Sequence, residues 1–221
     1  MTLQKLKNKI IILSSLLFVF QGVFSQTIES VYTNMPDVLN PTLSKQNRLE
    51  LLEYFKVGQS DSVTNRFGNQ AYITVFDSVY QVIKVKNTLV STFEIKLFNI
   101  NGNVPIVGII STVCAPVCQS AIQFYDTAWN VVPLKFKMPD ATDWINNDSL
   151  IQTVIDKQWI KSVMKTSFIT LSFGVDTNTI SAKNNSLQFL SVEDKKQLDP
   201  FVNDQIFVYH LKDKIWVKEP N

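Results

Sequence analysis

The chain has little histidine, cysteine, glycine or arginine, and each shortage excludes a class of function. His210 is the only histidine in 221 residues, so a zinc hydrolase site with several imidazole ligands cannot form. The six glycines form no G-x-G-x-x-G, Walker or G-x-S-x-G motif, so nucleotide chemistry is not expected. Arg48 and Arg66 are the only arginines, and no basic stripe alternates with aromatic residues, which argues against nucleic-acid binding.

The first 25 residues have the composition of a cleaved export signal. Lys5, Lys7 and Lys9 precede a mostly apolar run, and Ser25 supplies a small residue at the expected cleavage point. The run is too short to span a bilayer, and no later run reaches the roughly 18 apolar residues of a transmembrane helix. We expect cleavage before Gln26 and a mature protein in the periplasm or outside the cell, without a transmembrane segment.

The remaining residues, 26–221, are expected to form a single α+β domain. Removing 25 of the 221 residues leaves 196, enough to bury roughly 70% of the unfolded surface. No linker rich in proline, glycine or serine divides this part of the chain. Its charges nearly cancel, because 18 of the 21 lysines and arginines remain beside 19 acids once the three signal lysines are removed.

The first part after the signal is predicted to be helical. Ser44 is a plausible N-cap, and Leu49, Leu52 and Phe55 share one face that would dock on a sheet. Gly58 is expected to end this helix.

A hydrophobic period of two then predicts half-buried strands. The apolar side chains of Phe93, Ile95 and Leu97 alternate with charged ones. In the stretch 104–113 the side chains that would point to either face of a strand are mostly apolar. This stretch is therefore expected at the centre of the sheet. Strands that follow one another in pairs predict a largely antiparallel sheet with helices packed on one face. Further strands are predicted at 79–85, 122–126, 129–136, 168–173, 206–211 and 215–218, and helices within 143–164 and after Ser191.

Cys114 and Cys118 are the only cysteines and lie four residues apart. In an exported chain we expect a disulfide between them, with Cα atoms about 5–6 Å apart. So short a loop would be stabilised by only about 2 kcal/mol. Free thiols, or a redox or metal role, are the alternatives.

Copper or thiol-redox handling is the alternative chemistry. A strand followed by C-x-x-x-C is similar to the thioredoxin-fold copper chaperones, and two thiolates with an imidazole form a soft ligand set for copper. In this alternative alone Cys114, Cys118 and His210 are metal ligands; otherwise no cofactor is expected. The segment after Cys118 favours a strand hairpin over the helix of those chaperones.

A third possibility is a hydrolase that acts on envelope polymers. Asp126, Asp140, Asp143 and Glu94 are the acids nearest to loops or strand ends. A glycosidase needs two carboxylates roughly 5–9.5 Å apart, and the sequence brings no two of these together. No catalytic residue is therefore assigned, and an enzymatic role is not favoured.

Two separate segments carry a resemblance to a known family. The first has Met35-Pro36, then P-T-L, then N-R-L through E-Y-F ending at Phe55. The second begins at Thr112 as T-V-C-A-P and continues as S-x-I-x-F-Y-D-x-x-W to Trp129. With the signal before them, these segments resemble an uncharacterised family of exported proteins, a domain of unknown function from gut bacteria of the Bacteroidales type. The resemblance implies a shared compartment and fold, and no reaction.

These observations favour a non-enzymatic binding or structural module in the cell envelope. The chain has 15 Phe, 6 Tyr and 4 Trp, and exposed aromatic residues are natural contacts for a partner. Arg48, Tyr125 and Trp129 are therefore the candidate binding residues for a protein, peptide or glycan partner. Amphipathic packing at a hairpin is the alternative role of Tyr125 and Trp129.

Overall fold

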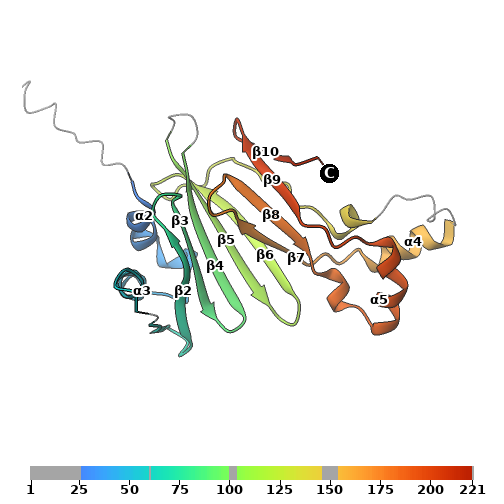
Figure 1. Ribbon diagram of the computed structural model, residues 1–221, viewed down its shortest axis with the longest axis horizontal. Coiled ribbons are helices and arrows are strands. Elements are labelled where there is room, and N and C mark those ends of the chain that lie inside the picture. The colour runs from blue at the N-terminus through green and yellow to red at the C-terminus, as the bar shows by residue number, and fades with distance from the viewer. Residues whose placement is uncertain (1–25, 60, 100–103, 146–153, 221) are drawn as a thin grey trace, which may run out of the picture.

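The computed structural model describes residues 26–59, 61–99, 104–145 and 154–220, so the expected signal at 1–25 lies outside the described residues. Within these ranges ten strands form two antiparallel sheets (Figure 1). The first sheet has six strands in chain order: β1 (Val63–Thr64), β2 (Gln70–Asp77), β3 (Val82–Thr88), β4 (Ser91–Phe98), β5 (Ile106–Cys114) and β6 (Cys118–Tyr125). The second has the order β10 (Ile215–Lys218), β9 (Phe207–Lys212), β8 (Thr179–Asn184) and β7 (Ile169–Phe173).

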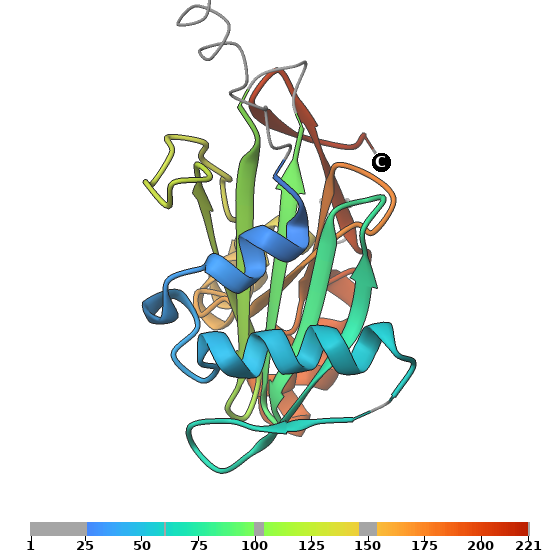
Figure 2. The same cartoon turned by 90° about the vertical axis from the view of Figure 1, so that its left-hand side faces the viewer.

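Helices cover one face of the first sheet and flank the second sheet. Figure 2 shows α2 and α3 lying across the strands of the first sheet. No helix in the described part of the chain is both long and apolar enough to cross a membrane. The α-helices are α2 (Ile28–Asn34), α3 (Lys45–Lys56), α4 (Val154–Val163) and α5 (Val192–Leu198), and the 3-10 helices are η1 (Asp37–Leu39), η2 (Ala141–Trp144), η4 (Ser186–Phe189) and η5 (Asp199–Phe201). The α+β fold class with an antiparallel sheet is confirmed.

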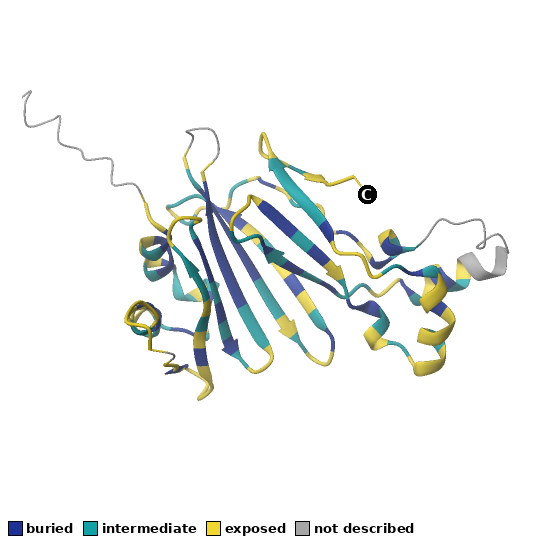
Figure 3. Cartoon of the chain, viewed as in Figure 1, coloured by how far each residue is buried: buried dark blue, intermediate teal, exposed yellow. Residues whose placement is uncertain are grey.

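Strand β4 shows how the alternation of side chains builds two cores. Its residues Phe93, Ile95 and Leu97 pack toward α2 and α3, whereas Phe98 packs between the two sheets. Both faces are covered, so Glu94 and Lys96 are buried as well, and the prediction of half-buried strands is wrong here. Figure 3 shows the resulting belt of buried residues along β4 and β5. The stretch predicted at the centre of the sheet, 104–113, forms β5, which is buried toward both faces over its first five residues but is the fifth of six strands, so the central position is wrong.

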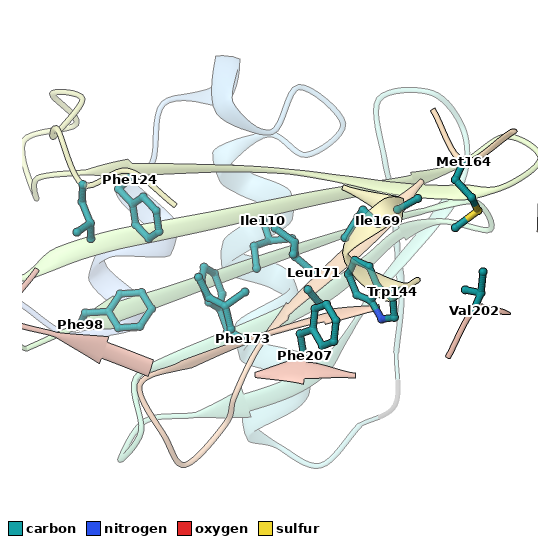
Figure 4. Close-up of a cluster of buried hydrophobic side chains, with 14 of the residues drawn as sticks. Phe98, Ile110, Phe124, Trp144, Met164, Ile169, Leu171, Phe173, Val202 and Phe207 are labelled. Carbon is teal, nitrogen blue, oxygen red and sulfur yellow. The ribbon is translucent and has the colours of Figure 1, made fainter. Parts of the chain in front are cut away.

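The core between the sheets is largely aromatic. Trp144 stacks on Phe207 with ring centroids 4.1 Å apart, and Phe98 meets Phe173 edge to face at 5.4 Å. Figure 4 shows these side chains directed into the space between the strands. Gly108 on β5 permits the close approach, because a Cβ there would lie 2.8 Å from ring atoms of both Phe98 and Phe173.

Helix α3 begins and ends where the sequence predicts. Ser44 and Asn47 form a reciprocal capping box, and Gly58 has the positive φ of 70° that suits the residue after a helix. The buried face predicted for this helix, Leu49, Leu52 and Phe55, is correct only for Leu52.

The face that α3 buries consists of Arg48, Leu51 and Leu52, whereas Leu49 and Phe55 are 36% and 38% exposed. Hydrophobic periodicity overlooks this face because an arginine is rarely buried completely.

The strands of the structure differ from the predicted ones at 129–136 and at β8. Residues 129–136 form no strand beyond an isolated bridge between Tyr125 and Val131, and Pro133 offers no N–H for a ladder. Strand β8, Thr179–Asn184, is not predicted by the sequence at all, because its small and polar residues alternate weakly. The predicted helical region 143–164 contains α4, and its central part, 146–153, lies outside the described residues. The predicted strand at 168–173, the hairpin of β9 and β10, and the Ser191 cap of α5 are confirmed.

Candidate functional site

Arg48 is the anchor of the loop that connects α2 to α3. Its side chain is 0% exposed, and its guanidinium Nη1 donates to Asp37 Oδ1 at 3.0 Å and to the carbonyl of Leu43 at 2.8 Å. Nη2 donates to the carbonyl of Met35 at 2.5 Å. The planar fork of an arginine suits this combination of acceptors, which a lysine could not satisfy. Arg48 therefore shapes the loop from inside and offers no surface to a partner.

Asp37 joins this buried anchor to the surface. Its carboxylate accepts hydrogen bonds from Arg48 and from the half-exposed Arg66. Desolvation opposes ionisation of Asp37, but the hydrogen bonds and charges of the two arginines outweigh it and hold the pKa of Asp37 below its usual value. The short helix η1, which starts at Asp37, is thereby fixed against the first sheet.

Tyr125 and Trp129 lie together on the same side of that sheet. The Tyr125 ring is buried, and its hydroxyl donates to Gln123 Oε1 at 2.7 Å. Burial raises the pKa of Tyr125. The half-buried Trp129 packs on it with ring centroids 6.0 Å apart.

A tight turn holds Trp129 in this place. Asp126 accepts hydrogen bonds from the backbone N–H groups of Ala128, at 2.9 Å, and Asn130, at 2.8 Å, and from the Asn130 amide, at 2.9 Å. Hydrogen bonds from the Asn130 side chain and from the backbone lower the pKa of Asp126. Trp129 has a φ of 69°, a conformation that the turn imposes.

A groove of about 240 Å³ lies between η1 and the sheet, and we call it the loop–sheet groove. Its lining carries no charged group, and Val38 at its edge is 80% exposed. Polar contacts are available from Ser111, Gln123 and Tyr125. The lining consists of Val38, Leu39, Ile109, Ser111, Ala121, Ile122, Gln123 and Tyr125. Such a surface suits a neutral ligand with both apolar and hydrogen-bonding groups.

The three candidate binding residues therefore differ in their position relative to this groove. Tyr125 lines it, Trp129 supports Tyr125, and Arg48 orders the loop that carries Val38 and Leu39. The two segments that carry the family resemblance meet here, one from each side. Sequence reasoning missed Val38, Ser111 and Gln123, because nothing in their local pattern marks them as neighbours.

The two cysteines are joined by a disulfide, as predicted. Their Cα atoms are 3.8 Å apart, so the expected separation of about 5–6 Å is wrong. Cys114 and Cys118 face each other across the closed end of the β5–β6 hairpin.

His210 is not part of a site with the cysteines. It lies on β9, where its half-exposed ring is 3.5 Å from the carboxylate of Glu219. No cluster of three or more His, Cys, Asp or Glu side chains suited to a metal ion occurs in the described ranges. The ligand set of the copper alternative is therefore not brought together.

The acids considered for hydrolysis have structural roles. Asp140 and Asp143 form the capping box of η2. Glu94 is paired with Lys84 at 3.2 Å and accepts hydrogen bonds from Ser172 Oγ and the Phe173 N–H at 2.9 and 2.8 Å. This buried pair links the two sheets, as does Lys96, which donates to three backbone carbonyls of the β7–β8 turn.

Comparisons with known proteins give a family and a fold. A family model described as "Protein of unknown function (DUF3256)" matches residues 20–216. Among solved structures, a domain of an uncharacterized protein from Porphyromonas gingivalis W83 is similar, with a TM-score of 0.69 and 18% identity over 88% of this chain and 98% of that chain. At this identity the likeness shows a shared fold. No curated protein matches the chain.

Proposed function

The chain belongs to the DUF3256 family of proteins of unknown function, and from this premise we propose that it is an exported, non-enzymatic binding module whose contact surface is the loop–sheet groove. Its partner would be a protein, peptide or glycan of the cell envelope that presents neutral polar and apolar groups.

The observation that carries the proposal is the way the groove is held open. Buried Arg48 fixes the loop on one side, and the Asp126 turn fixes Trp129 behind Tyr125 on the other. A surface that is already ordered loses little conformational entropy when a partner binds, which raises affinity for a given contact area.

The chemistry of the lining supports binding over catalysis. Ser111 is a potential nucleophile, but none of the other lining residues is a histidine, lysine or carboxylate that could act as its base. The Tyr125 hydroxyl already donates to Gln123 Oε1, so it offers a ligand its acceptor lone pairs.

Export is supported by two independent features. The N-terminal residues have the lysine-rich and apolar pattern of a secretory signal. The Cys114–Cys118 disulfide is of a kind that persists in oxidising compartments outside the cytoplasm.

Site-specific photocrosslinking in the producing cell tests the proposal. A photoreactive amino acid at the exposed Gln123 should give a discrete crosslinked product, and the same amino acid at Gln197 on α5 should not. Gln197 is a matched control because it is an exposed glutamine that does not line the groove. The product should disappear in Val38→Asp, which places a charge at the edge of the groove.

Two results would reject this assignment. Equal labelling from Gln123 and Gln197 would mean that the groove has no specific occupant. A product that persists unchanged in Val38→Asp would place the contact outside the groove.

A further inference from the structure

A second hollow lies at the end of the molecule where the β9–β10 turn approaches the start of β5, and we call it the hairpin-end pocket. Its volume is about 330 Å³, near the lower limit of the roughly 300–1,000 Å³ of small-molecule sites. Ile106 and Leu134 are buried in the core between the sheets, so the pocket reaches that core. Its lining consists of Val104, Pro105, Ile106, Val132, Pro133 and Leu134 together with Asp126 and Lys214.

The lining is poor in hydrogen-bond donors. Six of its eight residues are apolar, and Pro105 and Pro133 have no backbone N–H. A strongly polar ligand would lose its water without finding partners, which costs free energy. The body of any ligand that fills the pocket must therefore be apolar.

Its two charged residues differ in what they can offer a ligand. The Asp126 carboxylate already accepts three hydrogen bonds from Ala128 and Asn130, which fix its orientation toward its own turn. The Lys214 ammonium makes no hydrogen bond or ion pair with any described residue. Lys214 is consequently the group available to a ligand.

The backbone holds Lys214 in position. It follows Asp213 in the two-residue turn between β9 and β10, with φ values of 47° and 66°, the conformation of a tight hairpin turn. The Lys214 side chain is exposed, so its ammonium can meet an anionic group at the mouth of the apolar hollow.

We propose that the hairpin-end pocket binds a small molecule with an apolar body and a single anionic group, a carboxylate or a sulfonate, with Lys214 as its counter-ion. This site is separate from the loop–sheet groove, and the inference does not rest on the function proposed for that groove.

A matched pair of fluorescent probes tests the inference on the purified protein. Anilinonaphthalene sulfonate and N-phenyl-1-naphthylamine share one aromatic body, and only the first carries a sulfonate. We expect Lys214→Met to weaken binding of the sulfonate about tenfold, or about 1.4 kcal/mol, while binding of the neutral probe is unchanged. Lys212→Met is the control, because Lys212 is an exposed lysine of the same hairpin that does not line the pocket.

A second variant tests the location. Val132→Phe adds volume to the lining, and we expect it to weaken both probes and to reduce displacement of the sulfonate by decanoate. Thermal unfolding of each variant shows whether it is folded, and Lys214→Met changes only an exposed side chain. Equal affinity of wild type and Lys214→Met for the sulfonate would overturn the role of Lys214. Unchanged binding of both probes by folded Val132→Phe would overturn the site.

Discussion

At the scale of single residues, a few buried polar side chains decide how the surface loops are placed. Arg48 and Lys96 are both almost completely buried, and each donates hydrogen bonds to two or more backbone carbonyls of a loop or turn. A carbonyl that cannot reach water must have a partner, so each of these cations specifies one loop conformation.

Replacing Arg48 tests its role as an anchor. We expect Arg48→Met to lower the free energy of unfolding by about 3 kcal/mol or more, because the Met35 and Leu43 carbonyls lose their donor inside the protein. Arg66→Met is the matched control, since the exposed pair of Arg66 with Asp37 contributes at most about 1 kcal/mol. Urea unfolding of both variants measures the difference. Equal losses would contradict the anchoring role.

The lowered pKa of Lys96 predicts that the stability of the protein depends on pH. Burial and the neighbouring Lys84 cation lower the pKa of Lys96 from 10.5 to about 8. Between these values the unfolded chain binds more protons than the folded one, so the free energy of unfolding rises with pH from about 8 toward 10.5. We expect wild type to gain stability relative to Lys96→Met between pH 7.5 and about 9.5 in denaturant titrations. Parallel pH profiles of the two proteins would count against a lowered pKa.

At the scale of elements, the contact between the sheets depends on one small residue. Gly108 lies on β5 where Phe98, Phe124 and Phe173 converge from three other strands. The packing density of a protein core leaves no space there for a methyl group.

Gly108→Ala should therefore destabilise the protein by about 1–3 kcal/mol, because its Cβ would press on the rings of Phe98 and Phe173. Ser111→Ala on the same strand, but facing the groove, should change the free energy of unfolding by much less. Thermal or urea unfolding compares the two. A stable Gly108→Ala protein would show that the sheets separate more readily than their close contact indicates.

Reduction of the disulfide is expected to affect only the structure near it. It closes the tip of the β5–β6 hairpin, which is also held by the hydrogen bond from the Cys114 N–H to the Val90 carbonyl at 2.8 Å. Reduction should lower the free energy of unfolding by only about 2 kcal/mol, because so short a loop constrains few unfolded conformations. Unfolding with and without reductant tests this. Complete loss of the fold on reduction would mean that the hairpin tip organises the central strands.

At the scale of the whole molecule, the first sheet is shared by two cores. Its helix-facing side chains pack with α2 and α3, and its other face packs with the second sheet and the aromatic cluster (Figures 2 and 4). The loop–sheet groove remains open where η1, rather than a longer helix, lies beside β5 and β6. The groove therefore results from the shortness of this covering element.

The proposed export concerns the entire chain, and we expect the mature protein to begin at Gln26, with the residue either free or cyclised to pyroglutamate. Mass analysis of the N-terminal peptide from the cell envelope decides this. Protein that retains Met1 in that fraction would contradict cleavage.

Local patterns determined the parts of this protein that depend on neighbours in the sequence. The Ser44 and Ser191 caps, the stop at Gly58 and the final hairpin all follow from rules that act within a few residues. The disulfide was also predicted, because Cys114 and Cys118 are the only cysteines and lie four residues apart.

Only the tertiary structure decided which segments cover each face of the strands and helices. The burial of Arg48, Glu94 and Lys96 depends on segments that lie up to about 80 residues away in the chain, and periodicity carries no information about such partners. The loop–sheet groove is likewise made of η1 and β6, whose residues become neighbours only through the order of strands in the sheet. Local propensity acts over a single turn or strand, whereas a binding surface is an arrangement in space, and folding alone brings its parts together.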